Sequence, residues 1–330
     1  METLLLGSDA VEAHADLPAV IEAVEAAFGA YERGDATMPP KSYVDLPRYD
    51  GDFRAMPAYI DAGEWDAAAV KWVNSHPRNP ERHDLPTVMG TLIYSDPATA
   101  FPLAVMDGTE LTAARTGAAA AVATDHLAVP DAASLGLVGA GAQAATQLEA
   151  IAAVRDIERV VVSDADGARA EAFADRVADR FDARAGSVAA AAACDVVSTT
   201  TPVEEPVVER GMVGERTHIN AMGADAAGKH ELADDLLLDA KLVIDDYDQC
   251  THSGEINVPY AAGVLTDDDI HAELGAVVTG AAAGRTDADG VTVFDSTGLA
   301  IQDVAAARVV YERATAAGDG TPFDLLGLDG

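Results

Sequence analysis

The stretch Ser134-Leu135-Gly136-Leu137-Val138-Gly139-Ala140-Gly141-Ala142-Gln143-Ala144 decides the fold of this chain. Residues 134–138 form an apolar run that predicts a buried strand, and the glycines at 139 and 141 predict a tight turn. The Ala-rich segment 144–154 predicts a helix, and the apolar run 160–163 predicts the next strand. Asp164 ends that strand, 23 residues beyond Gly141. A dinucleotide-binding site has this order of strand, glycine turn, helix, strand and acid.

Each part of the pattern has a physical role in such a site. The glycines let the backbone approach a pyrophosphate, the helix N-terminus attracts its charge, and the acid accepts a hydrogen bond from a ribose hydroxyl. Ala144 stands at the third glycine position and still permits close packing of helix on strand. The alternative is an ordinary strand–helix turn. A carboxylate at Asp164 would repel a 2′-phosphate, which favours NAD over NADP, although Arg169 nearby leaves NADP open.

The composition excludes several classes of partner. The chain has 330 residues, with 21 basic and 56 acidic side chains and a formal net charge of −35. Nucleic acids and anionic membranes are unfavourable partners for such a surface. Only four lysines occur, Lys41, Lys71, Lys229 and Lys241, so each is a candidate for a specific role. The acidic excess suggests a protein that works in concentrated salt, where charge repulsion is screened; the alternative is an acidic enzyme from an ordinary environment.

Cysteine and histidine usage gives no indication of a metal site. Cys194 and Cys250 form no metal-spaced pair and suggest a reducing compartment, and the histidines are scattered. The first residues lack a basic n-region, and no apolar run reaches the length of a membrane span. We therefore expect a cytoplasmic protein that contacts neither membrane nor nucleic acid.

Hydrophobic periodicity predicts two domains. Residues 17–31 have helical spacing, with Asp16 as N-cap and Gly34 at the end. Strands are expected at 41–44, 53–59, 67–73, 87–94 and 101–106, followed by a helix over about 110–127. Pro130-Asp131 marks the start of the nucleotide domain, whose further strands are expected at 195–199, 217–221, 241–244 and 291–294. A short helix and loop are expected over 279–290.

The last helix, 299–317, is expected to return to the first domain and make it discontinuous. The predicted fold is therefore α/β: a Rossmann-type, doubly wound parallel sheet over 130–298, and an α/β dimerisation and substrate domain formed by 1–129 and 299–330.

A few polar residues in these elements could carry chemistry. Lys71 lies within an apolar strand, so its side chain either reaches outward to solvent or faces a pocket. Burial would lower its pKa and permit proton transfer near neutral pH. Arg54 and Arg115, each a plausible surface residue alone, form with Lys41 a cationic set that could hold a substrate carboxylate. Asp225 follows the strand 217–221, at the end of the sheet where ligands usually sit.

The sequence resembles the ornithine cyclodeaminase/μ-crystallin family, including archaeal-type alanine dehydrogenases, over nearly its whole length. The matching pieces are Met38-Pro39-Pro40-Lys41, Arg54-Ala55-Met56-Pro57-Ala58-Tyr59, Val70-Lys71-Trp72-Val73-Asn74 with His76-Pro77, Leu111-Thr112-Ala113-Ala114-Arg115-Thr116, the glycine turn, and Gly223-Ala224-Asp225 with Gly228-Lys229-His230-Glu231-Leu232.

The resemblance implies a homodimer with a Rossmann domain, a dimerising domain and an active site between them. It implies that Lys41 and Arg115 contact the substrate carboxylate, that Lys71 gives and takes the proton, and that Asp225 lies near the amine or the attacking water. The implied NAD-binding residues are Thr112, Thr116, Gly139, Gly141, Ala142, Gln143, Asp164, Ala165, Met222, Gly223, Ala224 and Ser296.

Members of the family share hydride transfer between the Cα of an amino acid and NAD, and differ in the fate of the imine. Water releases ammonia in a dehydrogenase, the far amine closes a ring in a cyclodeaminase, and a reductase runs the transfer in the other direction. The ornithine-cyclising members resemble one another in having an acidic residue at the position of Arg54, which would hold the cationic far amine. A cation at this position would instead repel an ornithinium side chain by roughly 1–4 kcal/mol. We therefore expect an NAD-dependent L-alanine dehydrogenase, with an ornithine cyclodeaminase, a ketimine or pyrroline-carboxylate reductase, and a non-catalytic binder as alternatives.

Overall fold

The computed structural model describes residues 2–327, and contacts within the chain divide it into two units. Unit 1 comprises Met1–Arg115 and Leu299–Gly330, and unit 2 comprises Thr116–Gly298. The break before residue 299 coincides with the expected one, but the first boundary falls inside a helix, α4 (Gly108–Leu127), whereas the sequence suggested a boundary after residue 129. The second half of α4 explains the difference, because Thr124 accepts a hydrogen bond at 3.0 Å from Asn220 within unit 2.

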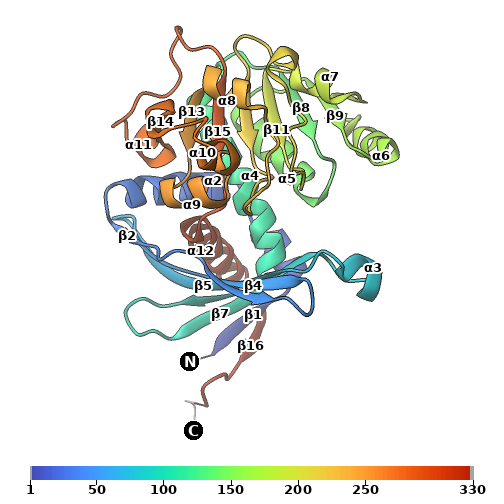
Figure 1. Ribbon diagram of the computed structural model, residues 1–330. Coiled ribbons are helices and arrows are strands. Elements are labelled where there is room, and N and C mark those ends of the chain that lie inside the picture. The colour runs from blue at the N-terminus through green and yellow to red at the C-terminus, as the bar shows by residue number, and fades with distance from the viewer. Residues whose placement is uncertain (1, 328–330) are drawn as a thin grey trace. The chain divides into compact units, whose positions relative to one another are not determined.

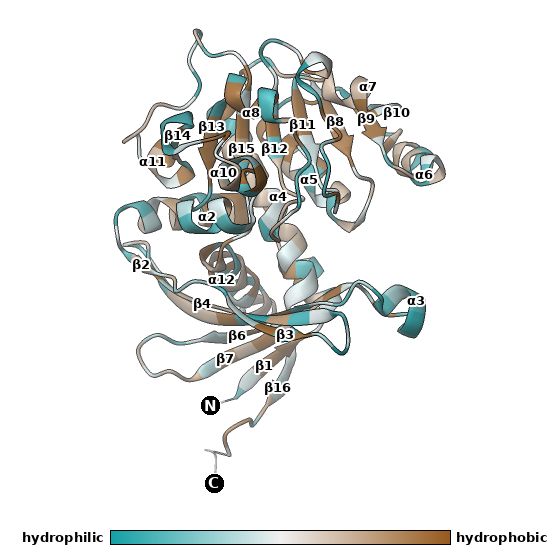
Figure 2. Ribbon diagram, viewed as in Figure 1, coloured by the Kyte–Doolittle hydropathy of each residue, from teal (hydrophilic) through white to brown (hydrophobic). Residues whose placement is uncertain are grey.

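Unit 2 is built on one parallel sheet of eight strands in the order β10-β9-β8-β11-β12-β15-β13-β14 (Figure 1). The strands are β8 (Ser134–Val138), β9 (Arg159–Ser163), β10 (Asp182–Ala185), β11 (Val196–Thr199), β12 (His218–Ala221), β13 (Lys241–Ile244), β14 (Ile270–Glu273) and β15 (Thr292–Asp295). In β8, β11, β12 and β15 every residue is buried, as expected of parallel strands covered on both faces. Their hydrophobic character is visible in Figure 2.

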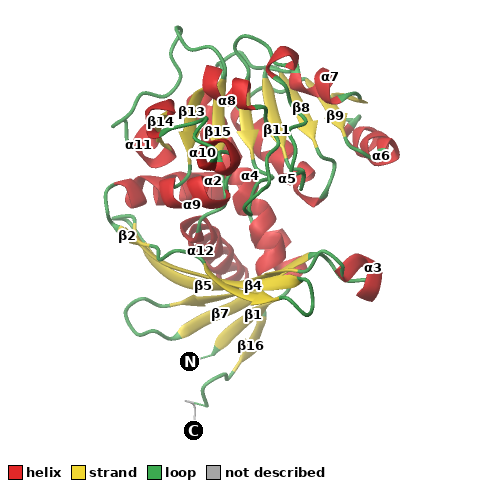
Figure 3. Cartoon of the chain, viewed as in Figure 1, coloured by secondary structure: helices red, strands yellow, loops and turns green. Residues whose placement is uncertain are grey.

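The helices of unit 2 flank this sheet (Figure 3). They are α5 (Ala142–Val154), α6 (Gly167–Val177), α7 (Val188–Ala192), α8 (Asp234–Asp239), α9 (Tyr247–Ser253), α10 (Asn257–Ala261) and α11 (Leu274–Val278), with 3₁₀ turns η1 (Arg210–Met212) and η2 (Asp267–Asp269). The order of strands reverses between β8 and β11, since the chain runs outward through β9 and β10 and then returns. Ligands of doubly wound sheets bind at the carboxyl ends of the strands at such a switch point. The Rossmann-type α/β fold predicted from the sequence is therefore confirmed.

Unit 1 contains a mixed sheet with the strand order β16-β1-β7-β6-β5-β4-β2, to which β3 adds by pairing with β4. Only the β1–β7 pairing is parallel. The strands are β1 (Thr3–Leu6), β2 (Ala36–Thr37), β3 (Ser42–Leu46), β4 (Gly51–Asp61), β5 (Asp66–Ser75), β6 (Val88–Ser95), β7 (Pro102–Asp107) and β16 (Thr321–Phe323). The helices are α1 (Ser8–His14), α2 (Leu17–Glu32), α3 (Asn79–His83), the first part of α4, and α12 (Ala300–Ala317).

The two faces of the unit 1 sheet differ. One face packs against α12, which contacts β4, β5 and β6, and its buried side chains include Met56, Lys71 and Leu92, which face one another in the register. The other face, free of helices in Figure 1, exposes Trp72 and Ile93 together with Leu5 and Val44. Because successive side chains of a strand point to opposite faces, Lys71 and Trp72 lie on opposite sides of the sheet.

Several sequence predictions need correction. The expected short helix within 279–290 is wrong: the helix there is α11, which ends at Val278, and Gly280 follows with φ of +75°, a conformation that stops a helix. The strands β1, β2, β10, β14 and β16 were not anticipated, since each is short and only partly buried or exposed, so none forms a continuously buried apolar run. Within residues 2–327, no helix is both long and apolar enough to cross a membrane.

Candidate functional site

The glycine turn lies between β8 and α5, at the switch point of the unit 2 sheet. Gly139 has φ of +105°, and a Cβ there would lie 2.8 Å from Thr200 Oγ1, so both the conformation and the space require glycine. Gly141 is the N-cap of α5, and a Cβ at this residue would meet no atom within 4 Å. The turn therefore presents open backbone at the N-terminus of a helix, which favours a negatively charged ligand.

Asp164 is tied to this turn from the end of β9. Its Oδ2 accepts a hydrogen bond from the Ala140 N–H at 2.8 Å, and its Oδ1 accepts one from the Asp166 N–H at 2.8 Å. Arg169 Nη1 lies 3.9 Å from Asp164 Oδ2, and the arginine side chain is mostly exposed. Ala165, the next residue along the chain, is exposed. The carboxylate thus lies beside the turn, as the sequence pattern required, with a cation near it.

The residues around the turn fit a dinucleotide. A hollow of about 520 Å³ opens beside it and is lined by Ala140, Gly141, Ala142, Ala145, Arg169 and Arg176. Gln143 Oε1, at the start of α5, is buried without a hydrogen-bond partner among the described residues, and a buried acceptor without a donor is uncommon. Open backbone donors, a helix N-terminus and an unsatisfied amide oxygen in one place suit a pyrophosphate and the groups attached to it.

Of the remaining predicted cofactor residues of unit 2, Thr116 lies in α4 and the others follow the neighbouring strands β12 and β15. Met222, Gly223 and Ala224 follow β12, where the Gly223 N–H donates to Glu231 Oε2 at 3.0 Å. Ser296 follows β15, and its hydroxyl donates to Asp245 at 2.9 Å. Thr116 is buried in α4, and its carbonyl accepts a hydrogen bond from Gln147 at 3.3 Å. Parallel strands end at one edge, so the residues after β12 and β15 share the edge of the glycine turn.

Lys71 is the centre of a buried cluster in unit 1. Its side chain is 1% exposed, which decides between the two orientations that the sequence allowed: it does not reach solvent. The Lys71 ammonium lies 2.7 Å from Asp303 Oδ1 and 3.1 Å from Thr112 Oγ1. The pKa of Lys71 is lowered from 10.5 to about 8: burial is the largest cause, the charges of Arg115 and Lys41 act in the same direction, and Asp303 opposes them.

Arg115 belongs to the same cluster. Its Nε donates to Asp303 Oδ1 at 3.1 Å, and its Nη1 donates to Gln302 Oε1 at 3.0 Å. Asp303 and Gln302 were missed by the sequence analysis. The available signal was two adjacent polar residues in the otherwise apolar start of the last helix, Leu299-Ala300-Ile301-Gln302-Asp303-Val304-Ala305. Thr112, expected among the cofactor residues, is in this structure a hydrogen-bond partner of Lys71.

Arg54 lies on the same sheet face as Lys71, because Met56, two residues along β4, pairs with Lys71 in the register. Its guanidinium is not a lone cation: Nη2 lies 3.0 Å from Asp52 Oδ2, and the Tyr43 ring lies 5.4 Å from its Cζ. Lys41 is partly exposed in the segment before β3. Unit 1 thus contains all four predicted cations, with Lys71 and Arg115 in direct contact with one carboxylate.

Asp225 lies in unit 2, in the segment after β12. Its carboxylate forms an ion pair with Lys229, four residues further along, and the side chain is 40% exposed. The structure therefore places Asp225 at the edge of the sheet where the sequence expected it, in a pair that would have to open for it to act on a substrate.

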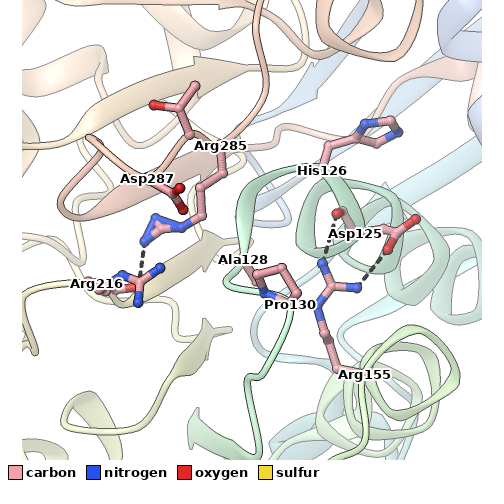
Figure 4. Close-up of a pocket in the computed structure, with 9 residues that line it drawn as sticks. Asp125, His126, Ala128, Pro130, Arg155, Arg216, Arg285 and Asp287 are labelled. Atoms are coloured by element: carbon pink, nitrogen blue, oxygen red, sulfur yellow. Dashed lines mark hydrogen bonds and ion pairs between the residues drawn. The ribbon is translucent and has the colours of Figure 1, made fainter.

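A second hollow in unit 2, of about 460 Å³, contains three arginines (Figure 4). Arg155 donates to the carbonyls of Thr124, Asp125 and Val129 and pairs with the Asp125 carboxylate at 2.6 Å. Arg285 donates to the carbonyls of Gly290 and Arg216. These guanidiniums fasten chain segments to one another. Among residues 2–327, no group of three or more His, Cys, Asp or Glu side chains is arranged to hold a metal ion.

The fold of unit 2 and its glycine turn define a Rossmann-type dinucleotide-binding protein. Comparison with known proteins gives the family: the model of the ornithine cyclodeaminase/mu-crystallin family matches residues 1–318. The alanine dehydrogenase of Archaeoglobus fulgidus is 47% identical over 315 residues, which are 95% of this chain and 96% of that protein. The chain therefore belongs to the ornithine cyclodeaminase/mu-crystallin family, as the sequence motifs indicated.

Two solved structures extend the comparison. An archaeal alanine dehydrogenase dimer with bound NAD has a TM-score of 0.94 and 46% identity, covering 99% of this chain and 100% of that one. The Thermococcus litoralis Delta(1)-pyrroline-2-carboxylate reductase, in complex with NADH and L-proline, has a TM-score of 0.92 and 36% identity, covering 97% and 99%. Relatives of this similarity make the chain an NAD-dependent dehydrogenase in class, and leave its substrate to be decided.

Proposed function

We propose that the chain catalyses the reversible oxidative deamination of L-alanine: L-alanine, NAD⁺ and water give pyruvate, ammonium and NADH with release of a proton. The observation that carries this proposal is the buried lysine, Lys71, whose pKa is lowered to about 8 beside Arg115. General acid–base catalysis is most effective when the pKa of the group lies near the working pH. The relative from Archaeoglobus fulgidus supports alanine as the substrate.

The cluster suits the carboxylate of an amino acid. With Lys71 protonated, the contacts of Lys71, Arg115 and Asp303 sum to one net positive charge in a buried place, which an anion would neutralise. Arg115 uses Nε and Nη1 for Asp303 and Gln302, and we assign its remaining nitrogen, with Lys41, to the substrate carboxylate.

Bound NAD would supply the hydride acceptor for the Cα–H of the amino acid. The residues proposed to hold it are those of the glycine turn with Asp164, Met222, Gly223, Ala224 and Ser296, and Thr112 and Thr116 from α4. Lys71 takes a proton from the substrate ammonium group and releases it to solvent. It then takes a proton from the water that adds to the imine carbon and gives that proton to the departing amine. We assign Asp225 to orient that water, which requires its pair with Lys229 to open.

Arg54 is a weaker discriminator in the structure than in the sequence. Asp52 lies within 3.3 Å of the Arg54 guanidinium, so its charge reduces the repulsion that an ornithinium side chain would meet. The pair still offers no free carboxylate of the kind that a second ammonium group would need. Arg54 therefore supports a small neutral side chain, such as the methyl group of alanine, over a cationic one.

The exposed face of the unit 1 sheet supports a homodimer. Val44, Trp72, Ile93 and Leu5 are 46%, 44%, 40% and 39% exposed. Large apolar side chains gathered on one sheet face commonly mark an interface. We propose that a second copy of the chain covers this face, and the similarity to an archaeal alanine dehydrogenase that is a dimer supports the proposal.

The direct test is a substrate panel in molar salt with both nicotinamide cofactors. We expect NADH formation that depends on L-alanine, with pyruvate and ammonium in equal amounts, and weaker use of NADP. Formation of proline from ornithine without alanine-dependent NADH would contradict the proposal and indicate a cyclodeaminase.

A second candidate is reduction of a cyclic imine, because the same buried Lys71 could deliver the proton in that direction. The similarity to the Thermococcus litoralis reductase favours it as the alternative. NADH oxidation with Delta(1)-pyrroline-2-carboxylate, and none with pyruvate and ammonium, would identify this activity. No turnover with any amino acid or imine would leave the non-catalytic binder.

A further inference from the structure

One carboxylate oxygen of Asp303 forms ion pairs with two cationic side chains. Lys71 Nζ lies 2.7 Å and Arg115 Nε lies 3.1 Å from Asp303 Oδ1, and the aspartate side chain is 1% exposed. The partners are distant in sequence, since Asp303 lies in the first turn of α12 and Lys71 in the middle of β5. One carboxylate therefore determines where both of the predicted functional cations lie relative to each other.

The other oxygen of Asp303 has no hydrogen-bond partner. Asp303 Oδ2 is buried and unpaired among residues 2–327. An ion pair that served stability alone would be expected to satisfy both oxygens, because an unsatisfied buried acceptor costs free energy. The arrangement leaves part of the capacity of Asp303 unused, and it is well suited to hold Lys71 and Arg115 together at one point.

The hydrogen bonds around Lys71 fix the direction of its lone pair. The Thr112 hydroxyl donates to the Gly108 carbonyl at 2.6 Å, so its oxygen is an acceptor for Lys71. A neutral Lys71 has two N–H bonds, and these are directed at Thr112 and Asp303. Its lone pair then points in the one remaining direction, which is what a general base requires.

The adjacent residue on α12 fixes the other end of Arg115. Gln302 Oε1 accepts from Arg115 Nη1 at 3.0 Å, while Asp303 accepts from Nε. The guanidinium is planar, so two contacts on neighbouring nitrogens determine its plane. Gln302 is itself fully buried and cannot turn toward solvent.

We propose that Asp303 is the positioning residue of this enzyme, holding Lys71 and Arg115 in the one arrangement that serves amino-acid turnover. This inference rests on the proposed function, since it assigns Lys71 and Arg115 to the substrate. Asp303 acts through these two residues and contacts no reacting atom. Its charge also opposes the effect of burial on the pKa of Lys71.

The first experiment reads Lys71 directly and needs no substrate. The chain has four lysines, so labelling with [ε-¹³C]lysine gives four signals, and the one lost in Lys71→Arg identifies Lys71. We expect its midpoint near pH 8 in the wild type and at least about one pH unit lower in Asp303→Asn, because a carboxylate in contact favours the charged lysine. An unchanged midpoint in a folded Asp303→Asn variant would overturn the proposal.

The matched control is Asp289→Asn, which removes the carboxylate that pairs with Lys241 at 3.1 Å in unit 2. It should leave the Lys71 midpoint at its wild-type value. A shift as large as that of Asp303→Asn would show that any loss of acidic charge moves the midpoint, and would also overturn the proposal.

The second experiment uses the pH profile of kcat/KM for the substrate that the wild type turns over. In Asp303→Asn, the limb that reports Lys71 should move to lower pH together with the NMR midpoint, and KM should rise tenfold or more because Arg115 loses a charged partner. If Asp303→Asn does not fold, Asp303→Glu decides: it keeps the charge, so the midpoint should stay within half a unit while KM rises. A wild-type KM in Asp303→Glu would contradict a positioning role.

Discussion

The two units bury charge in opposite ways. In unit 1 the buried charges are of both signs, with Lys71 and Arg115 on one oxygen of Asp303. In unit 2 the carboxylates of Glu231, Glu255 and Asp295 are fully buried, and among residues 2–327 none of them forms an ion pair with a lysine or arginine. They accept hydrogen bonds from backbone N–H groups and hydroxyls instead.

Glu231 shows the unit 2 arrangement most clearly. Its two oxygens accept from the Thr201 N–H, the Gly223 N–H and the hydroxyls of Thr199 and Thr201, at 2.7 to 3.0 Å. Glu255 likewise accepts from the N–H groups of Glu231 and Leu232. Burial raises the pKa of both glutamates, and the nearby charge of Glu231 raises the pKa of Glu255 further.

The difference indicates a structural role for the buried carboxylates of unit 2 and a catalytic role for the cluster in unit 1. Backbone N–H groups in irregular loops have no acceptor in the sheet, and the unit 2 carboxylates accept their hydrogen bonds instead. These bonds hold the segments after β11 and β12 in place. The unit 1 cluster leaves one buried oxygen unsatisfied and keeps a lysine whose pKa is near 8. We therefore expect substitutions in unit 1 to affect turnover first and those at the unit 2 carboxylates to affect stability first.

The largest effect is expected for Lys71→Ala. Loss of the acid–base group should lower kcat by about 10²- to 10⁴-fold, while the affinity for NADH, measured by fluorescence titration, stays within about twofold. Loss of NADH binding together with turnover would mean that Lys71 supports the structure of the site and not the chemistry.

Glu231→Leu tests the other half of the comparison. It removes the acceptor of the buried Thr199 hydroxyl and of the partly buried Thr201 and Gly223 N–H groups, so the free energy of unfolding should fall by about 3 kcal/mol. Urea titration in molar salt measures this change. Glu231→Gln, which keeps the shape and one acceptor oxygen, should lose less than half as much, and equal stability of wild type and Glu231→Leu would refute the scaffolding role.

Asp295 makes the comparison depend on pH. Burial raises its pKa from 3.8 to about 7, so between these values the folded chain keeps a proton that the unfolded chain has released. This contribution to stability is present below pH 4 and is lost as the pH rises towards 7. Asp295→Asn should remove a slope of about 1.4 kcal/mol per pH unit from that range. An identical pH dependence of unfolding in both proteins would contradict the shift.

Lys71 should act in the opposite sense and at higher pH. The pKa of Lys71 in the folded chain is about 8, below the ordinary 10.5. Between these values the unfolded chain keeps a proton that the folded chain has lost, so the free energy of unfolding rises as the pH increases from 8 to 10.5.

The smallest effect is expected at Asp164, which shares features of both groups: its oxygens accept backbone N–H groups, yet it borders the hollow at the glycine turn. Asp164→Ser should raise the KM for NAD about tenfold and reduce the preference over NADP, with little change in the KM for alanine. The control is Asp166→Ser, since the Asp166 carboxylate caps α6 by accepting a hydrogen bond from the Ala168 N–H. Equal KM values for NAD in both variants would remove Asp164 from the cofactor site.

Local patterns predicted the fold well. The apolar run 134–138 is β8 to the residue, and the strand expected at 241–244 is β13, because buried parallel strands are continuous apolar runs bounded by turn residues. The expected helix at 279–290 is wrong because Gly280, with its positive φ, ends the helical segment, although the Ala-rich composition there favours a helix.

The candidate site could be predicted only in part. The chain has only four lysines, and Lys71 stood out because it lies within an apolar strand. Which way its side chain points could be seen only in the structure. The polar pair Gln302-Asp303 in an apolar helix start marks Asp303 only weakly among 56 acidic residues, because its importance comes from a contact with a strand residue 232 positions away in sequence. The pairing of Arg54 with Asp52 was equally hidden, although the two lie only two residues apart.

The central claim is that an amino acid gives its Cα hydrogen to NAD beside Lys71. The most direct measurement follows the label from L-[2-²H]alanine in molar salt, by mass spectrometry of the reduced cofactor and of the oxo acid. The account predicts deuterium at C4 of NADH, with unlabelled pyruvate formed in equal amount. Unlabelled NADH, or no pyruvate from alanine while another amino acid or imine reacts, would contradict it.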